Sequence, residues 1–456
     1  MSIIHKTSRH TTSRRSLLKL GGMALAAGIA APHLWIPRVG HAKIPASKKH
    51  HVLIYFLDGG ARSVPMFNAG VGSQWNPLGA QAGSPGTEWA VGKVFVDDLV
   101  NPSLLHMSHE ICVLGTCDHT PGEPVGVGDH AVARNFVGSG FPGGGAGLLS
   151  LIHGHHKSYT EPSLSPPFPP VLLGAGDGTQ YFGVPKGGAL APVKIPSYSE
   201  FAAQKGNDAG GQPEFARALE DGLDHNTVAI RSARDRFRID QLRNGKAAVQ
   251  TYRDIFLDPV LAVAGAPAAT MHGLSNAELA TMLGPDLLSF NTALALRFIG
   301  FGSAAVVVGD TGWDTHSGES AMFAASANRL GRTFAGLSLA LKALKFPDNT
   351  SYWDNTLVLT ISEFGRDNLM PSGYNSGGGS DHTGGPGSRY QAYACFGGLV
   401  DAAKRGKLFG ATDSVTMEPK PGEPVFSTRS ILAMVLGLLD IDPTPHFPEP
   451  PLDILF

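Results

Sequence analysis

The sequence is short of charge and of cysteine, and each shortage excludes a class of protein. Charged residues make up 16% of the 456 residues and the formal net charge is −2, so nothing electrostatic favours nucleic acid or an anionic membrane as a partner. The three cysteines are too few for a disulfide framework. Cys112 and Cys117 lie in or beside an apolar run and are predicted to be core residues, and a disulfide between them is the less favoured alternative.

Glycine and proline are abundant by contrast, at 58 and 33 residues, and the hydrophobic share is 42%. Disordered chains are more charged and less apolar than this, so the mixture predicts long ordered loops over a compact core. The length suits one large α/β domain or two smaller ones. We expect a single domain over residues 51–456, with an insert at 141–280 that is loop-rich and then helical.

Residues 1–42 are predicted to form a twin-arginine signal peptide. Ser13–Lys19 reads SRRSLLK, an apolar stretch covers about 17–36, and Gly40-His41-Ala42 offers a small-x-Ala cleavage site. The alternative is a membrane anchor. It is disfavoured because glycines and Pro32 interrupt the apolar stretch and no second span follows.

The leader predicts a location and a partner for the mature protein. We expect recognition by the twin-arginine export machinery, a periplasmic or otherwise exported product, and a short basic linker at 43–50. No stable membrane span is expected after cleavage. Because this route carries folded proteins, often with a metal or cofactor already bound, the leader also hints at a metal.

Short apolar runs alternate with helical patterns, which indicates an α/β fold with a mostly parallel sheet. Strands are predicted at 51–57, 111–115, 304–308, 356–361 and 390–396. Helices are predicted at 131–137, 214–243, 285–300, 320–344 and 428–439. The functional groups of such folds gather just past the carboxyl ends of the strands.

Two of these strand ends carry acids and histidines. Asp58 follows the first strand and precedes two glycines, an arrangement common at metal or phosphate sites, although Asp-Gly also forms plain turns. Asp314 and His316 follow the strand at 304–308 and are predicted metal ligands, with Asp310 as a third candidate oxygen donor. The alternative is a polar turn with a capping aspartate.

The strand at 356–361 leads to a third group. Glu363 and Arg366 follow it directly, and Asp381 and His382 come after a Gly-rich loop. Glu363 and His382 are predicted metal ligands, and Arg366 is predicted to hold an anionic substrate. The alternative is a solvated ion pair between Glu363 and Arg366, followed by a flexible linker.

Histidines occur at two further places. Asp129 and His130 stand at the start of the predicted helix 131–137, where amide groups and the helix dipole favour an anion. Asp129 could equally be only the N-cap of that helix. The second group has no carboxylate at a suitable spacing and is interpreted as exposed loop; it comprises His153, His155 and His156.

The strand-end residues resemble the ligands of the alkaline phosphatase superfamily, whose members hold two metals at the carboxyl edge of a sheet. Several motifs also resemble signatures of the exported bacterial family catalogued as domain of unknown function fifteen hundred and one: Gly312–His316, Ser362–Arg366, Asp381-His382 and Gly410–Asp413. With the leader, the resemblance covers most of the chain. It implies an alkaline phosphatase-like three-layer sandwich, with a mostly parallel central sheet flanked by helices and with loop-rich and helical insertions.

The resemblance also implies a ligand set. Asp58 is similar to the first-strand metal ligand of alkaline phosphatases. Asp314 and His316 are similar to the Asp and His of the first metal, at a narrower spacing than in that family, and His382 is similar to the same metal's last histidine. Glu363 begins the pair that stands where the second metal has Asp-His, and because its successor is a phenylalanine, one histidine ligand is missing.

His130 falls where alkaline phosphatases have their nucleophilic serine, and no Ser, Thr or Cys shares that slot. Histidine can act as a nucleophile or as a metal ligand, so His130 is a predicted catalytic residue. Arg366, which is predicted to hold the anionic substrate, is the second. The resemblance implies a periplasmic hydrolase of small or polymeric phosphate or sulfate esters, dependent on one or two divalent ions: zinc, manganese, iron or calcium. The alternative, favoured by the missing histidine and serine, is a catalytically degenerate exported protein that binds a ligand or partner.

Overall fold

The computed structural model describes residues 50–96, 102–158, 169–174, 176–186, 191–195, 270–271, 274–300, 302–346 and 348–456. All of them belong to one compact unit, Pro37–Phe456. The predicted signal peptide, the linker up to residue 49 and the predicted helix 214–243 lie outside the described residues. Within the described ranges, no helix combines the length and the apolar character needed to cross a membrane.

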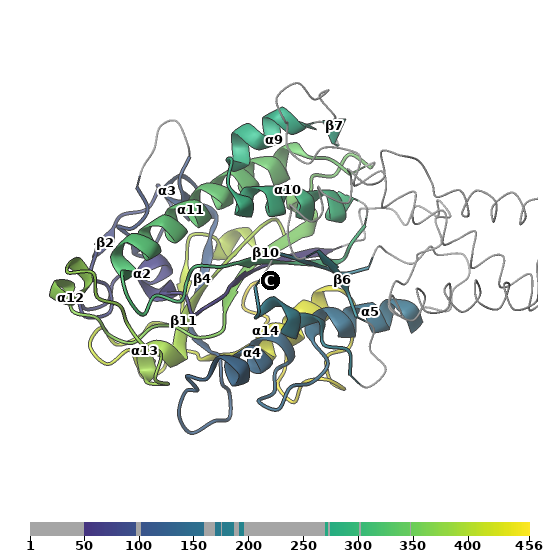
Figure 1. Ribbon diagram of the computed structural model, residues 1–456. Coiled ribbons are helices and arrows are strands. Elements are labelled where there is room, and N and C mark those ends of the chain that lie inside the picture. The colour runs from purple at the N-terminus through teal and green to yellow at the C-terminus, as the bar shows by residue number, and fades with distance from the viewer. Residues whose placement is uncertain are drawn as a thin grey trace, which may run out of the picture. The chain divides into compact units, whose positions relative to one another are not determined.

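A large sheet organises the described part of the chain, with strand order β12-β4-β11-β10-β1-β9-β5-β6 and β13 paired to β4 (Figure 1). Its strands are β1 His51–Leu57, β4 Cys112–Asp118, β5 Val171–Leu173, β6 Val193–Ile195, β9 Ala305–Asp310, β10 Thr356–Ser362, β11 Tyr390–Phe396, β12 Leu408–Phe409 and β13 Phe426–Ser427. β11 runs antiparallel to β10 and β4, and the other neighbouring strands pair in parallel. The predicted mostly parallel sheet is confirmed.

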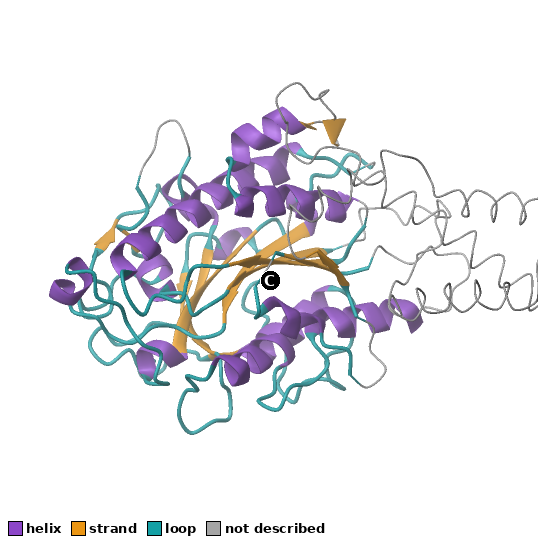
Figure 2. Ribbon diagram, viewed as in Figure 1, coloured by secondary structure: helices purple, strands orange, loops and turns teal. Residues whose placement is uncertain are grey.

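Helices cover both faces of this sheet (Figure 2). The helices are α2 Ser63–Phe67, α3 Leu104–Met107, α4 His130–Ser139, α5 Leu148–Ser158, α9 Asn276–Leu283, α10 Leu287–Gly300, α11 Glu319–Ala343, α12 Pro371–Asn375, α13 Pro386–Arg389 and α14 Thr428–Leu438. Single 3-10 turns are η2 Ser108–Glu110, η3 Thr179–Gly183, η6 Trp353–Asn355 and η7 Ala402–Lys404. Two small hairpins pair β2 Ala80–Gln81 with β3 Val91–Gly92, and β7 Thr270–Met271 with β8 Leu274–Ser275.

The central strand β1 shows why its sequence is continuously apolar. Successive side chains of a strand point to opposite faces. Leu53 and Tyr55 pack in one core with residues of α2, α3, α9, α10 and α11, whereas Val52 and Ile54 pack in a second core with α4, α5 and α14. Because both faces are buried, the strand has no polar side, and the three-layer α/β/α arrangement follows.

The predicted insert at 141–280 contains regular structure in its loop-rich part. α5 begins at Leu148, and β5 and β6 are strands of the central sheet. His153 is buried in α5 and its Nδ1 lies 2.7 Å from the carbonyl oxygen of Ala191, so it is not exposed loop. The two strands escaped prediction because each has only three residues among many glycines and prolines. All three cysteines are buried and free, as the core interpretation predicted for Cys112 and Cys117.

Candidate metal centre

Three parallel strands bring the candidate residues to one edge of the sheet. In β1, Leu57 lies opposite Ser362 of β10 on one side and Asp310 of β9 on the other. Asp58 and Glu363 therefore leave the sheet side by side, and the loop after β9 returns beside them. The functional groups thus gather beyond the carboxyl ends of β1, β9 and β10, where an α/β sheet places its ligands.

Two glycines after β1 allow these loops to approach each other. Gly59 has a φ of +110°, and a Cβ built there would lie 2.5 Å from the backbone nitrogen of Asp314. Gly60 has a φ of +85°, and its Cβ would lie 2.3 Å from the ring of Phe364. Any side chain at either position would be strained and would push the loops apart, so the packing of the site requires glycine at both.

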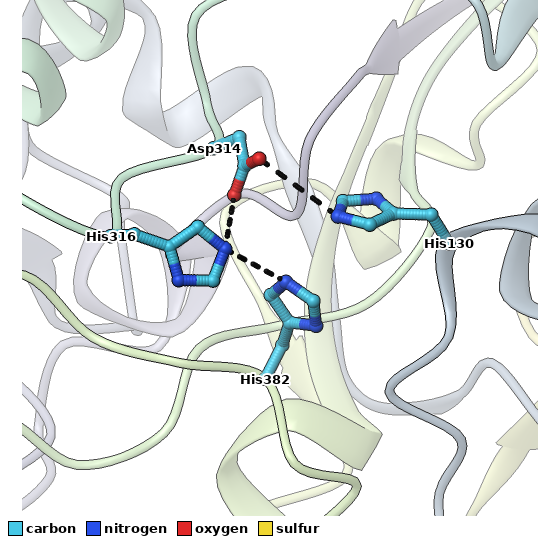
Figure 3. Close-up of side chains that lie close together, drawn as sticks. All are labelled: His130, Asp314, His316 and His382. Carbon is cyan, nitrogen blue, oxygen red and sulfur yellow. Dashed lines mark hydrogen bonds and ion pairs between the residues drawn. The ribbon is translucent and has the colours of Figure 1, made fainter.

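Four side chains converge at this edge: His130, Asp314, His316 and His382 (Figure 3). One candidate ligand atom from each lies within 4.8 Å of all the others. His316 Nε2 is 3.0 Å from Asp314 Oδ1 and 3.2 Å from His382 Nε2. His130 Nε2 lies 3.8 Å from Asp314 Oδ2. Three imidazoles and a carboxylate therefore face one point from α4 and from two loops.

The three imidazoles share one orientation, with Nε2 toward the cluster and Nδ1 toward an oxygen. His382 Nδ1 lies 2.8 Å from the carbonyl oxygen of Gly128. His130 Nδ1 lies 3.2 Å from Glu363 Oε1, and His316 Nδ1 lies 3.7 Å from Asp381 Oδ1. Metal-binding histidines almost always face a carboxylate or carbonyl with their second nitrogen, which fixes the tautomer that leaves the first nitrogen free for the metal.

The donor set fits a divalent transition metal. Imidazole and carboxylate ligands suit zinc, copper, iron or nickel better than calcium or magnesium, which prefer oxygen. In a tetrahedral site with metal–nitrogen distances of about 2.0–2.1 Å, the ligand atoms lie about 3.3 Å apart. The observed separations of 3.0 and 3.2 Å around His316 Nε2 are close to that value. His130, Asp314, His316 and His382 are thus the residues that could hold such an ion.

The pKa directions of Asp314 and His382 agree with these roles, whereas the direction at His130 favours the charged imidazole in the absence of a metal. Burial is the largest influence on Asp314 and raises its pKa, but Arg366 and His316 outweigh burial and leave the pKa below its usual value. Burial lowers the pKa of His382, so its imidazole stays neutral at physiological pH. The contact with Glu363 raises the pKa of His130 against the opposing effect of burial. A carboxylate and a neutral imidazole are the protonation states that a metal requires.

Two of the five predicted metal ligands lie outside this cluster. Asp58 is 7% exposed and Glu363 is fully buried, and both are held by Arg134 of α4. Glu363 Oε1 also accepts a hydrogen bond from the backbone N–H of Gly59 at 2.6 Å. Burial, then the nearby Glu363, raises the pKa of Asp58, and Arg134 opposes both. Because its Oε1 lies 3.2 Å from His130 Nδ1, Glu363 contacts the cluster without being one of its four residues.

Arg366 has a different role from the predicted one. Its side chain has no exposed surface. Its nitrogens donate to the backbone carbonyls of Gly59, Gly60, Trp313 and Ser380 and to Asp314 Oδ1, over 2.6–3.0 Å. The solvated pair with Glu363 is likewise not formed. With every nitrogen bonded to protein, Arg366 cannot hold a substrate and instead ties the loops together and orients Asp314.

The two open alternatives for aspartates are resolved by their contacts. Asp129 is the N-cap of α4, since its side chain accepts a hydrogen bond from the N–H of Val132 at 2.9 Å. Asp310 is buried and accepts from Arg329 Nη2 at 2.8 Å and from Trp313 Nε1 at 3.0 Å. Neither belongs to the four-residue cluster.

Asp310 gives a pH-dependent prediction. Burial, only partly opposed by Arg329, raises its pKa from 3.8 to about 6. The folded state therefore binds this proton more tightly than the unfolded chain, and the stability it contributes below pH 4 is lost as the pH rises toward 6. Between pH 4 and 7 the free energy of unfolding should fall by up to about 3 kcal/mol more in the wild type than in Asp310→Asn. Urea unfolding of both proteins between pH 4 and 7 measures this difference in the free energy of unfolding. If the free energies of the two proteins change in parallel with pH, the prediction is refuted.

Sequence reasoning missed Arg134, the arginine that pairs with Asp58 and Glu363. A signal was present, because Arg134 follows His130 by four residues and residues so spaced share one face of a helix. Arg134 Nη2 lies 2.9 Å from Asp58 Oδ1, and Arg134 Nε lies 2.7 Å from Glu363 Oε2. Its partners follow two other strands, and only the fold brings them together.

Fold and site together define the class: a three-layer α/β protein with a cluster of side chains that could hold a metal at the carboxyl edge of a mostly parallel sheet. Similar solved structures include a phosphonate monoester hydrolase of Agrobacterium radiobacter, at 11% identity and a TM-score of 0.38, over 89% of this chain and 77% of that one. The PsFucS1 sulfatase from Pseudoalteromonas sp. matches at 12% identity and a TM-score of 0.36, over 92% of this chain and 74% of that one. At these TM-scores the similarity carries no argument about activity.

The family model described as Protein of unknown function (DUF1501) matches residues 198–450, more than half of the chain. The chain belongs to this family, as its motifs predicted. Those motifs lie inside the matched region, whereas Asp58 and His130 precede it. No curated protein matches the chain.

Proposed function

We propose that the protein is an exported, metal-dependent hydrolase of phosphate or sulfate esters. The observation that carries the proposal is the convergence of three Nε2 atoms and one carboxylate, with an oxygen 2.8–3.7 Å from the Nδ1 of each imidazole. The motif SRRSLLK at Ser13–Lys19 supports export by the twin-arginine pathway. That pathway suits a protein that takes up its metal before it crosses the membrane.

The exposure of the cluster favours catalysis over a structural role. Structural zinc sites are closed, whereas catalytic ones keep an open position for water or substrate. The side chains of Asp314 and His316 are 45% and 49% exposed, so this centre is open to solvent. The chemistry that a bound ion supplies is polarisation of the ester and activation of water. His130 serves as a ligand in this arrangement, which leaves attack on the ester to water.

The remaining residues hold this geometry. Glu363 Oε1 lies 3.2 Å from His130 Nδ1, on the side of the ring away from the cluster, and Arg366 fixes Asp314. His382 stacks on Phe364 with ring centroids 4.0 Å apart, which sets the plane of its imidazole. Such supporting contacts typically change metal affinity or activity 10–100-fold when removed.

Removal of the metal gives the direct test. The mature protein is purified after export, screened against aryl and sugar phosphate and sulfate esters, and assayed again after chelation and after return of zinc, manganese, iron or calcium. We expect hydrolysis that is lost on chelation, restored by one of these ions, and reduced at least roughly 100-fold in His130→Ala. His109→Ala is the matched control, because His109 is an exposed histidine outside the cluster.

The outcomes separate the enzyme from a degenerate, ligand-binding protein. Stoichiometric metal with no hydrolysis of any ester, in wild type or His130→Ala, would favour the binding protein. Neither bound metal nor thermal stabilisation by added ions would refute the proposal altogether.

A further inference from the structure

The two carboxylates that lie outside the cluster form a second, anionic group. Asp58 and Glu363 follow neighbouring strands and are 7% and 0% exposed. Their mutual repulsion is strong enough to contribute to the raised pKa of Asp58. Two carboxylates buried this closely need a cation, because buried charge without a partner is costly.

Arg134 supplies that cation from α4. Its Nη2 lies 2.9 Å from Asp58 Oδ1 and its Nε lies 2.7 Å from Glu363 Oε2, so one guanidinium bridges both acids. Its side chain is 17% exposed. His130 lies one helical turn earlier on the same face of α4. Helix α4 thus presents a metal-ligand histidine and a fixed positive charge side by side.

A metal ion and this guanidinium cannot share the two carboxylates. Arg134 holds one oxygen of each acid, and the other two accept from the backbone N–H groups of Gly59 and Gly178, so all four carboxylate oxygens already have a partner. A divalent ion about 2.0–2.2 Å from these acids would also meet the positive charge of Arg134 at hydrogen-bonding range. The guanidinium already neutralises one of the two negative charges without the cost of dehydrating an ion.

We infer that the guanidinium of Arg134 occupies the place of a second metal ion, so that the protein binds a single divalent ion, in the cluster of His130, Asp314, His316 and His382. The inference rests on the metal site of the proposed function. It predicts that removal of Arg134 turns Asp58 and Glu363 into a second cation site. Two carboxylates with water would suit an oxygen-preferring ion such as Mn²⁺.

The experiment uses the mature protein loaded with zinc and then titrated with Mn²⁺, with free Mn²⁺ followed by electron paramagnetic resonance. Wild type and Arg134→Lys should bind no stoichiometric Mn²⁺. Arg134→Ala should bind one Mn²⁺ per chain, and Arg134→Ala combined with Asp58→Asn should bind it at least tenfold more weakly. Arg389→Ala is the matched control: it also strips a buried carboxylate, Asp118, of its arginine, but it exposes one acid rather than two.

Either of two results would overturn the inference: stoichiometric Mn²⁺ on zinc-loaded wild type, or no more Mn²⁺ on Arg134→Ala than on wild type. Zinc analysis of the same samples reports on the proposed function separately, since wild type without zinc would refute the metal cluster and leave the Mn²⁺ difference between variants readable. Circular dichroism shows whether each variant is folded. If Arg134→Ala is not, Arg134→Met keeps the aliphatic bulk while it removes the charge and the N–H donors, and it should gain the same Mn²⁺ site.

Discussion

Replacing Asp314 and His382 together by alanine is expected to abolish metal binding and to leave the protein folded. The two residues supply two of the four donors, one to each side of His316 Nε2, at 3.0 and 3.2 Å. Two remaining histidines do not make a tetrahedral site, so zinc should fall from about one ion per chain to almost none. The side chain of Asp314 is 45% exposed, so its removal leaves little cavity, but the variant also deprives the buried Arg366 of its carboxylate and Phe364 of its stacked ring, so we expect a folded protein of lower stability.

Zinc content after dialysis and thermal unfolding with and without zinc measure this effect. An ion present at 100 times its dissociation constant stabilises the folded state by about 2.7 kcal/mol, so zinc should raise the melting temperature of the wild type and not of the double variant. The matched control changes the same residue types outside the cluster, in His109→Ala with Asp453→Ala, and should retain zinc. A double variant that keeps its zinc would place the metal elsewhere.

The strands could be predicted because their sequence signal is local. Apolar runs that end in polar residues placed strands at 51–57 and 390–396, which are the bounds of β1 and β11. An apolar run of three residues is too short to predict a strand, so β5 and β6 were not predicted within this region rich in glycine and proline. The antiparallel direction of β11 is set by pairing with β10 and β4, and nothing within its own residues reports that.

The candidate site could be predicted in its residue types more than in its roles. His130 was recognisable because it begins a helix, and Asp314 and His316 because they follow a strand. His382 was recognisable because it ends the loop after the next strand, and such ends meet at one edge of the sheet. Which acid binds metal depends instead on which arginine reaches it. Asp314 pairs with the buried Arg366, yet its side chain remains exposed to solvent at the cluster. Glu363 is fully buried and pairs with Arg134, a residue more than two hundred positions away in the sequence.

Arg366 shows how much of the site depends on one buried charge. Arg366→Ala is expected to lower the free energy of unfolding by about 3–5 kcal/mol, because it leaves Asp314 without its cation and four buried carbonyls without their donor. For a chain of this size the loss corresponds to a fall of roughly 5 °C in melting temperature. Because Asp314 loses its orienting partner, metal affinity should also fall about 10–100-fold.

Arg366→Lys separates charge from geometry. Lysine restores the positive charge but not the planar fork that reaches Gly59, Trp313 and Ser380 together, so most of the loss in stability and affinity should remain. Arg332→Ala is the control, since Arg332 forms a partly exposed pair with Asp286, which should be worth at most about 1 kcal/mol. Calorimetry gives the melting temperatures, and zinc titration gives the affinities. If lysine restores both the melting temperature and the zinc affinity, charge alone matters at this position. The positioning role assigned to the Arg366 guanidinium would then be wrong.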